Sequence, residues 1–344
     1  MHRRKFISTA AALSTCLQAQ ERKPQVRFGI DLFSIRSQNW TPFEYLDYCA
    51  RWKAKVVHFS EIRFIGGLEP AHLKQVRAHA ERLGIEIELG MRSICPSSKA
   101  FDPAQGTASQ QLLRMLEAAK HAGSPIVRCF LGTMADRVGG SATIDGHIEN
   151  TVKVIRPLRS RFQDANVKIA IENHAGDMQA RELKTLIEEA GKDFTGACLD
   201  SGNPVWAIED PHLTLETLAP YVLTSHVRDS SVWMTPQGIA VRWTRMGEGN
   251  VGIAAWVRRY AELCPGRAMS LEIIVTGPRT HAIYDPAFWD GYRNTPAWEF
   301  SRFLAIAEKG KPSPYTPPPR DEAVRRERED LEASARWVQD FFHL

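Results

Sequence analysis

The sequence predicts a single-domain (β/α)8 barrel with a C-terminal helical extension, and three observations support this prediction. Apolar runs of strand length alternate with longer segments of helical period, as expected for parallel strands joined by crossover helices. Eight such runs occur, which is the number that closes a barrel. The length of 344 residues also suits one domain of this class.

The expected strands and helices follow one another in order along the chain. The strands are residues 26–32, 55–59, 85–89, 126–130, 167–172, 196–200, 222–227 and 269–274. The helices are residues 42–52, 69–83, 109–122, 144–162, 180–190 and 253–263, and several follow a threonine that can cap a helix. A doubly wound open sheet is the alternative. It would normally carry a glycine-rich phosphate loop after an early strand, and none of the first three turns contains one.

The two ends of the chain differ from the expected barrel at residues 26–310. Residues 1–20 combine a basic start at Arg3 and Arg4 with a short apolar run, and this pattern resembles a twin-arginine export signal. We therefore expect an exported, periplasmic protein, with a basic disordered N-terminus as the alternative. The apolar run is too short to span a bilayer. Residues 311–344 are expected to form a Pro-rich linker and a charged helix with an apolar side, and residues 276–296 a long loop at the barrel mouth.

Composition restricts the partners of the protein. Hydrophobic residues make up 43% of the chain and charged residues 24%, which is ordinary for a globular enzyme. The net charge of +4 is small for this length, so no nucleic-acid partner is expected. Beyond residue 20, five cysteines remain without a CxxC spacing, which argues against a disulfide framework. The oligomeric state stays open, a homo-oligomer included.

Each of the last four expected strands carries one metal-competent side chain at or near its end. These side chains are Glu172, Asp200, His226 and Glu272. In a parallel barrel the C-terminal strand ends open on one face, so the four would converge in one pocket. Singly, each has an ordinary explanation as a helix cap, a salt-bridge partner or a core histidine. Together they favour a shared cation, because a cation relieves the repulsion between three buried carboxylates.

Short motifs accompany these side chains. They are Ile171-Glu172-Asn173-His174, Leu199-Asp200-Ser201-Gly202-Asn203, His226-Val227-Arg228-Asp229, Gly247-Glu248-Gly249-Asn250-Val251 and Leu271-Glu272. In this order and spacing they resemble the xylose isomerase-like barrel superfamily, in particular its sugar phosphate isomerase/epimerase branch, over residues 26–309. The resemblance implies that Glu172, Asp200, His226 and Glu272 bind one divalent ion such as Mn²⁺, Mg²⁺, Co²⁺ or Zn²⁺. It also implies that Glu172 and Glu272 act as an acid/base pair.

The proposed ligands suit carbonyl chemistry. Three oxygen ligands and one nitrogen ligand fit a fairly hard ion and leave positions for substrate oxygens. Such an ion polarises a ketone and stabilises an enediolate, while two carboxylates move protons on either side of the substrate. We expect a metal-dependent isomerase or epimerase of a free ketose, a keto-sugar or a related sugar derivative. The alternative is a lyase or hydratase that eliminates across a 3-keto-glycoside or a cyclitol.

Further polar residues near the strand ends are candidate substrate contacts. They are His174, Asn203, Arg228, Glu61 and His58. Asn203 stands where ketose 3-epimerases often have His, and this departure puts simple epimerisation in doubt. His174 and Arg228 are alternatively surface or supporting residues. For Glu61 and His58, at the end of the second strand, loop salt bridges are the competing interpretation.

Two other functions would suit a barrel of this kind. An abasic-site endonuclease would need a multi-zinc cluster with several additional histidine ligands and a basic groove, and the sequence offers too few such residues. A sugar-binding barrel that has lost catalysis would show Ala or Gln at ligand positions, and none is seen. Catalysis is therefore favoured.

Overall fold

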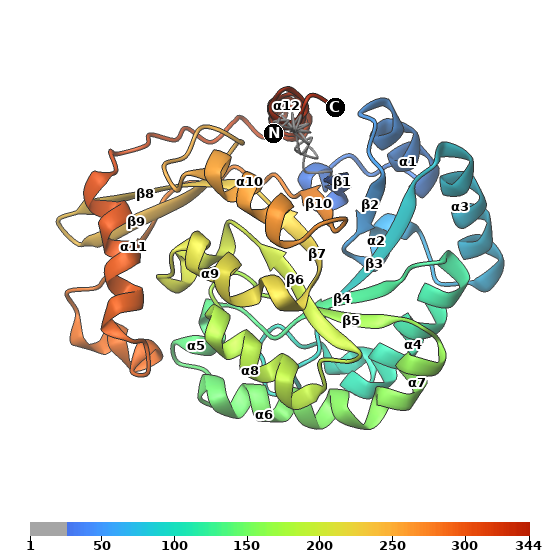
Figure 1. Cartoon of the computed structure of the whole chain (residues 1–344), viewed down its shortest axis with the longest axis horizontal. Helices are drawn as coiled ribbons and strands as arrows, with labels where there is room; N and C mark the ends of the chain where they lie inside the picture. Colours follow the sequence, from blue (N-terminus) through green and yellow to red (C-terminus); the bar gives the residue numbers. More distant parts are fainter. Residues whose placement is uncertain (1–25) are drawn as a thin grey trace, which may run out of the picture.

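The computed structural model of the chain describes residues 26–344, and the expected export signal lies outside the described residues. Eight parallel strands form one closed barrel in the order β1-β10-β7-β6-β5-β4-β3-β2 (Figure 1). They are β1 (Arg27–Asp31), β2 (Val56–Phe59), β3 (Glu86–Ser93), β4 (Ile126–Phe130), β5 (Lys168–Glu172), β6 (Thr195–Asp200), β7 (Val222–Val227) and β10 (Ala268–Leu271). The expected (β/α)8 barrel is confirmed, and each of the eight strands overlaps a run read from the sequence, although β3 continues beyond its run to Ser93.

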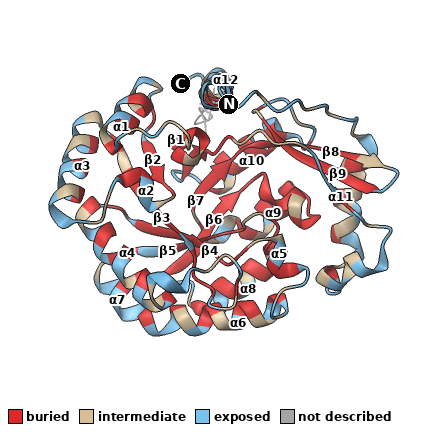
Figure 2. Cartoon of the chain, turned by 180° about the vertical axis from the view of Figure 1, so that it is seen from behind, coloured by how far each residue is buried: buried red, intermediate tan, exposed pale blue. Residues whose placement is uncertain are grey.

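Helices surround the barrel and bury their apolar sides against it, so buried residues lie inward and exposed residues outward (Figure 2). The outer helices in chain order are α1 (Pro42–Arg51), α3 (Pro70–Leu83), α4 (Ala108–Ala122), α6 (Ile144–Ile155), α8 (Ala180–Ala190), α9 (Pro211–Leu218) and α10 (Ile253–Leu263). The shorter helices α2 (Ile62–Ile65), α5 (Met134–Arg137) and α7 (Arg159–Asp164) lie in connections. Thr41 and Thr107 cap α1 and α4 through capping boxes, as their sequence positions indicated.

The C-terminal helix α12 (Ala323–Phe342) lies against the barrel between α1 and α10. Its buried apolar residues join the main core at Leu331, Ala335 and Val338. Arg336 lies over the ring of Trp52 just after α1, and Arg258 of α10 lies over the ring of Phe341. α12 thus takes the outer position that the eighth helix of a (β/α)8 barrel occupies.

A second, antiparallel sheet of order β11-β9-β8 stands beside the barrel (Figure 1). It consists of β8 (Asp229–Thr235), β9 (Gly238–Thr244) and β11 (Arg279–His281). This sheet was not expected from the sequence, and residues 276–296 were expected to form a loop. Helix α11 (Ala297–Lys309) covers β8, and a small separate core that includes Val232, Val241 and Phe303 lies between them. Because β8 begins at Asp229, right after β7, the sheet extends the barrel on its C-terminal face.

All five cysteines between residues 26 and 344 are buried and free. None of the helices in the described part of the chain combines the length and the apolar character that a bilayer crossing requires.

Candidate metal centre

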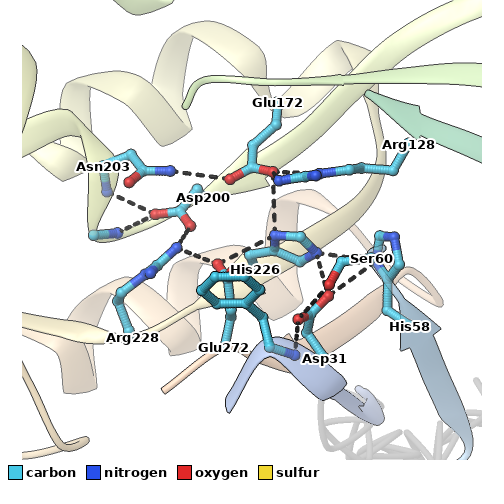
Figure 3. A network of polar contacts seen from close by, with 12 residues as sticks. Asp31, His58, Ser60, Arg128, Glu172, Asp200, Asn203, His226, Arg228 and Glu272 are labelled. Atoms are coloured by element: carbon cyan, nitrogen blue, oxygen red, sulfur yellow. Dashed lines mark hydrogen bonds and ion pairs between the residues drawn. The ribbon is translucent and has the colours of Figure 1, made fainter. Parts of the chain in front are cut away.

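The structure brings Glu172, Asp200, His226 and Glu272 together at the C-terminal end of the barrel (Figure 3). One ligand atom from each residue lies within 4.8 Å of those from the other three. The four come from adjacent strands, because β5, β6, β7 and β10 are neighbours in the barrel. All four side chains are buried, and Glu272, just after β10, is the most exposed at 5%.

The two ring nitrogens of His226 face different partners: one faces Glu172 and Glu272, and the other faces His58 and Asp31. Its Nδ1 lies 3.3 Å from Glu172 Oε2 and 3.4 Å from Glu272 Oε2. On the other side, Nε2 lies 2.9 Å from His58 Nδ1 and 3.2 Å from Asp31 Oδ2. A proton on Nε2 can therefore be donated behind the ring, which leaves Nδ1 as the nitrogen that faces the cluster.

Two arginines approach the same carboxylates. Arg128 of β4 donates from Nε to Glu172 Oε2 at 2.5 Å. Arg228, between β7 and β8, donates from Nη2 to both Asp200 Oδ2 and Glu272 Oε2. Arg228 was expected as a substrate contact, whereas Arg128 was missed. The signal for Arg128 was a single charged residue inside the apolar run 126–130, since a buried strand rarely carries an unpaired charge.

The electrostatics of the cluster favour a cation in its midst. Burial alone would raise the pKa of Glu172, but Arg128 and His226 hold it well below its usual range. Burial would likewise raise the pKa of Glu272, yet Arg228 and His226 lower it. Burial alone would lower the pKa of His226, but the surrounding acidic groups raise it well above the ordinary value. Negative charge therefore predominates around Nδ1, and a positive charge is stabilised there.

Burial raises the pKa of Asp200, although the charge of Arg228 partly offsets this. The loop after β6 orients Asp200 together with Glu172. The backbone N–H of Asn203 donates to Asp200 Oδ1 at 2.6 Å, and its side-chain Nδ2 donates to Glu172 Oε1 at 3.0 Å. Asn203 is itself 2% exposed. This candidate substrate contact therefore lies in the cluster and links two of the four candidate ligands.

The other candidate substrate contacts lie at different depths. His174 is half-buried, stacks on Phe130 at 3.9 Å between ring centroids, and approaches Gly132 O with Nδ1 at 2.7 Å. His58 was expected to line the mouth, but it is fully buried behind His226, so it supports the imidazole rather than facing a substrate. Glu61 lies outside the cluster and forms an ion pair with Arg63 Nε at 2.5 Å. This contact agrees with the alternative that Glu61 forms a salt bridge in its loop.

The residues present fit one divalent ion. Within residues 26–344, several buried polar atoms without a hydrogen-bond partner gather at this place. Those that can offer a lone pair to a cation are Asp31 Oδ2, Asn203 Oδ1 and His226 Nδ1, whereas Nε and Nη1 of Arg228 are donors that cannot bind one. Three carboxylates and one imidazole are ligands that Mn²⁺, Mg²⁺, Co²⁺ and Zn²⁺ accept. Two overlapping groups, Asp31–His58–His226 and Glu172–Cys198–His226, offer only three ligands each.

Comparison with known proteins places the chain in a family. The xylose isomerase-like TIM barrel family matches residues 45–289, which is more than half of the sequence. This chain belongs to the xylose isomerase-like TIM barrel family. A relative, the 3-oxo-isoapionate decarboxylase of Pectobacterium atrosepticum, is 26% identical over 184 residues, or 54% of this chain and 59% of the relative. The match thus spans less than two thirds of that relative's length.

Solved structures of xylose isomerase-like barrels share the fold. A D-psicose 3-epimerase from Clostridium cellulolyticum is 13% identical, with a TM-score of 0.58 over 91% of this chain and 99% of the other. A xylose isomerase-like TIM barrel protein from Mycobacterium smegmatis, solved with magnesium, is 13% identical, with a TM-score of 0.55 over 82% of this chain and 96% of the other. These likenesses show the fold, and a sugar epimerase is among the solved structures that share it.

Proposed function

We propose that this xylose isomerase-like barrel is a metal-dependent sugar isomerase or epimerase that forms an enediolate from a free ketose, a keto-sugar or a related sugar derivative. The observation that carries the proposal is the convergence of Glu172, Asp200, His226 and Glu272 within 4.8 Å of one another. Bound by these four residues, a divalent ion would supply Lewis-acid polarisation of the substrate carbonyl. The neighbours that bind sugars or magnesium support this choice at the level of the fold.

Glu172 and Glu272 are the residues that would move the proton. Arg128 and Asn203 hold the two oxygens of Glu172 as a carboxylate, and Glu272 is a carboxylate that contacts Arg228 in this structure. Their lowered pKa values keep them ionised at neutral pH, the form that accepts a proton from the carbon next to a carbonyl.

The decarboxylase relative favours a second candidate, a lyase that uses the same four residues. Loss of CO₂ from a 3-oxo acid and loss of a proton next to a carbonyl both leave an enolate. The electrostatic environment that stabilises one such anion also stabilises the other. Asn203 in place of the histidine of many ketose 3-epimerases agrees with a reaction other than simple epimerisation. Elimination across a 3-keto-glycoside or a cyclitol belongs to the same class.

One experiment tests both candidates. The purified protein, loaded with Mn²⁺ and assayed for bound metal by elemental analysis, is incubated in deuterated water with keto-sugars and 3-oxo sugar acids. Deuterium in an intact sugar supports the isomerase or epimerase, and release of CO₂, water or an aglycone supports the lyase. We expect about one ion per chain, and a loss of turnover of about 100-fold or more in Glu172→Gln while the circular dichroism spectrum is retained.

The matched control is Glu61→Gln, which changes a carboxylate at the same face but outside the cluster, and it should keep wild-type turnover. A protein that binds no divalent ion, or a Glu172→Gln variant with wild-type turnover, would contradict the proposal.

We also propose that residues 1–20 export the chain. Cell fractionation tests this by comparing the full-length protein with a variant in which Arg3 and Arg4 are replaced by Lys.

A further inference from the structure

We propose that Arg228 competes with the divalent ion for the metal centre, so that its guanidinium group must leave Asp200 and Glu272 before both can bind the ion. The inference rests on the proposed metal dependence and concerns a residue of this chain. Arg228 would then be an internal cation that holds the acidic cluster together whenever the ion is not bound.

The position of one guanidinium nitrogen is the first argument. Arg228 Nη2 contacts Asp200 Oδ2 and Glu272 Oε2, which come from β6 and from the residue after β10 (Figure 3). These carboxylates are two of the four candidate ligands. A nitrogen that contacts both oxygens lies between them, and an ion bonded to both oxygens must lie there as well. The two cations therefore require the same space and the same lone pairs.

The side-chain stem of Arg228 is held firmly by its neighbours, whereas its guanidinium group makes few contacts. A Cβ atom at position 202 would lie 2.6 Å from Arg228 Cδ, so Gly202 is what allows the stem to pass. On the other side, the guanidinium carbon lies 4.4 Å from the ring centroid of Trp243. Trp243 is fixed in turn, because its Nε1 donates to Gly202 O at 2.9 Å.

The head group has unused donors despite its burial. Arg228 is 1% exposed, yet its Nε and Nη1 have no hydrogen-bond partner among the described residues. A guanidinium group has five N–H donors, and buried arginines normally use most of them. The carboxylates of Asp200 and Glu272, rather than a complete set of hydrogen bonds, therefore determine where this group lies. A stronger cation for those carboxylates would shift it, because the two positive charges repel each other at short range.

Removal of this guanidinium group should have two opposite effects. Without the ion, the three buried carboxylates lose a counter-charge and the folded protein becomes less stable. With the ion, nothing competes for Asp200 and Glu272, and binding becomes tighter. Removal of a residue that only supports the site would instead lower both the stability of the ion-free protein and its affinity for the ion.

The test compares Arg228→Met with the wild type, because Met keeps an apolar stem against Gly202 and Trp243. After treatment with a chelator, the Kd for Mn²⁺ is measured by isothermal titration calorimetry and Tm is measured with and without Mn²⁺. We expect Kd to fall about tenfold or more, Tm without Mn²⁺ to fall, and the rise in Tm caused by Mn²⁺ to increase. Arg137→Met is the matched control, since Arg137 is a buried arginine paired with Glu182 outside the centre. It should lower Tm equally with and without Mn²⁺ and leave Kd unchanged.

An unchanged or weakened affinity for Mn²⁺ in folded Arg228→Met would overturn the inference. If that variant does not fold after treatment with a chelator, Arg228→Lys replaces it. Lys keeps a charge on a head group that cannot bridge two carboxylates as a planar guanidinium does, so its Kd should again be lower than that of the wild type. A wild type that binds Mn²⁺ and turns over substrate, with unchanged Kd in both variants, refutes only the role of Arg228. A wild type that binds no Mn²⁺ refutes the proposed function as well.

Discussion

His226 is oriented by residues that do not reach the carboxylate side of its ring. His58 Nδ1 lies 2.9 Å from its Nε2, and Asp31, which accepts a hydrogen bond from Ser60 at 2.9 Å, lies 3.2 Å away. Burial holds the pKa of His58 well below its usual value, with the neighbouring charges of His226 and Arg128 adding to the effect. His58 is thus a neutral acceptor. Such partners behind a ligating histidine fix its tautomer and its direction.

We therefore expect His58→Phe to weaken metal binding rather than substrate binding. The phenyl ring keeps most of the buried volume but removes the acceptor for His226 Nε2, and loss of such a partner typically costs about 10–100-fold in metal affinity. Calorimetric titration with Mn²⁺ measures this loss, and KM for the substrate should change little. Glu61→Gln, at the same end of β2, is the control and should leave both quantities unchanged. A raised KM with unchanged metal affinity would instead restore His58 as a substrate contact.

The N-terminus of helix α8 contacts the buried carboxyl group of Glu209. Both oxygens of Glu209 lie 3.1 Å from the N–H nitrogen of Ala180, and Thr214 donates to Oε2 at 2.6 Å. A negative charge suits the start of a helix. Burial nevertheless dominates and raises the pKa of Glu209 from 4.5 to about 7. The element that follows β5 is therefore stabilised best when this carboxyl group is protonated.

This shift predicts a pH dependence of stability with a definite sign. Because the pKa of Glu209 is higher in the folded than in the unfolded chain, its contribution to stability is present below about pH 4.5 and is lost as the pH rises to about 7. Glu209→Gln cannot ionise, so its free energy of unfolding should decline less over that range, by up to about 3 kcal/mol. Urea unfolding at several pH values measures the difference. Glu189 is an exposed residue of α8, so Glu189→Gln should keep the wild-type dependence of stability on pH. The same pH dependence in Glu209→Gln would contradict the raised pKa of Glu209.

Closure of the whole molecule depends on the last helix. After β10 the chain first builds β11 and α11 beside the mouth and only then returns with α12 to the gap between α1 and α10. Ser37 and Arg36 contact Glu327 of α12, and Arg245 forms an ion pair with Asp330. α12 therefore joins the region after β1 to the end of β9. We expect α12 to unfold together with the barrel.

Leu331→Ala tests this integration. Leu331 is fully buried in the main core, so truncation should lower the free energy of unfolding by about 2–5 kcal/mol in a single cooperative transition. Val324 lies on the same helix with 39% of its side chain exposed, and Val324→Ala should change stability by less than about 0.5 kcal/mol. Urea unfolding followed by circular dichroism measures both. A separate early transition for α12, or no effect of Leu331→Ala, would show that the helix is an appendage.

The barrel and the four converging side chains can be predicted from the sequence, because both follow from local patterns. Strand runs have a recognisable length and composition, and a parallel barrel brings the C-terminal ends of its strands to one face. Glu172 and Asp200 end their strands, His226 lies one residue before a strand end and Glu272 directly follows one, so their meeting needs no knowledge of side-chain packing.

Side-chain contacts and partly polar elements depend on the tertiary structure. Arg128 meets Glu172 across 44 positions of sequence, and Arg228 meets Glu272 across the same separation. His58 of β2 lies behind His226 of β7 because the closed barrel brings both side chains into its interior, although β1 and β10 separate the two strands, a relation that no local period contains. The sheet of β8, β9 and β11 packs against α11 instead of the barrel, so its pattern does not match that of a barrel strand. Contacts between distant segments decide these features, since burial and charge pairing arise only after the chain has folded.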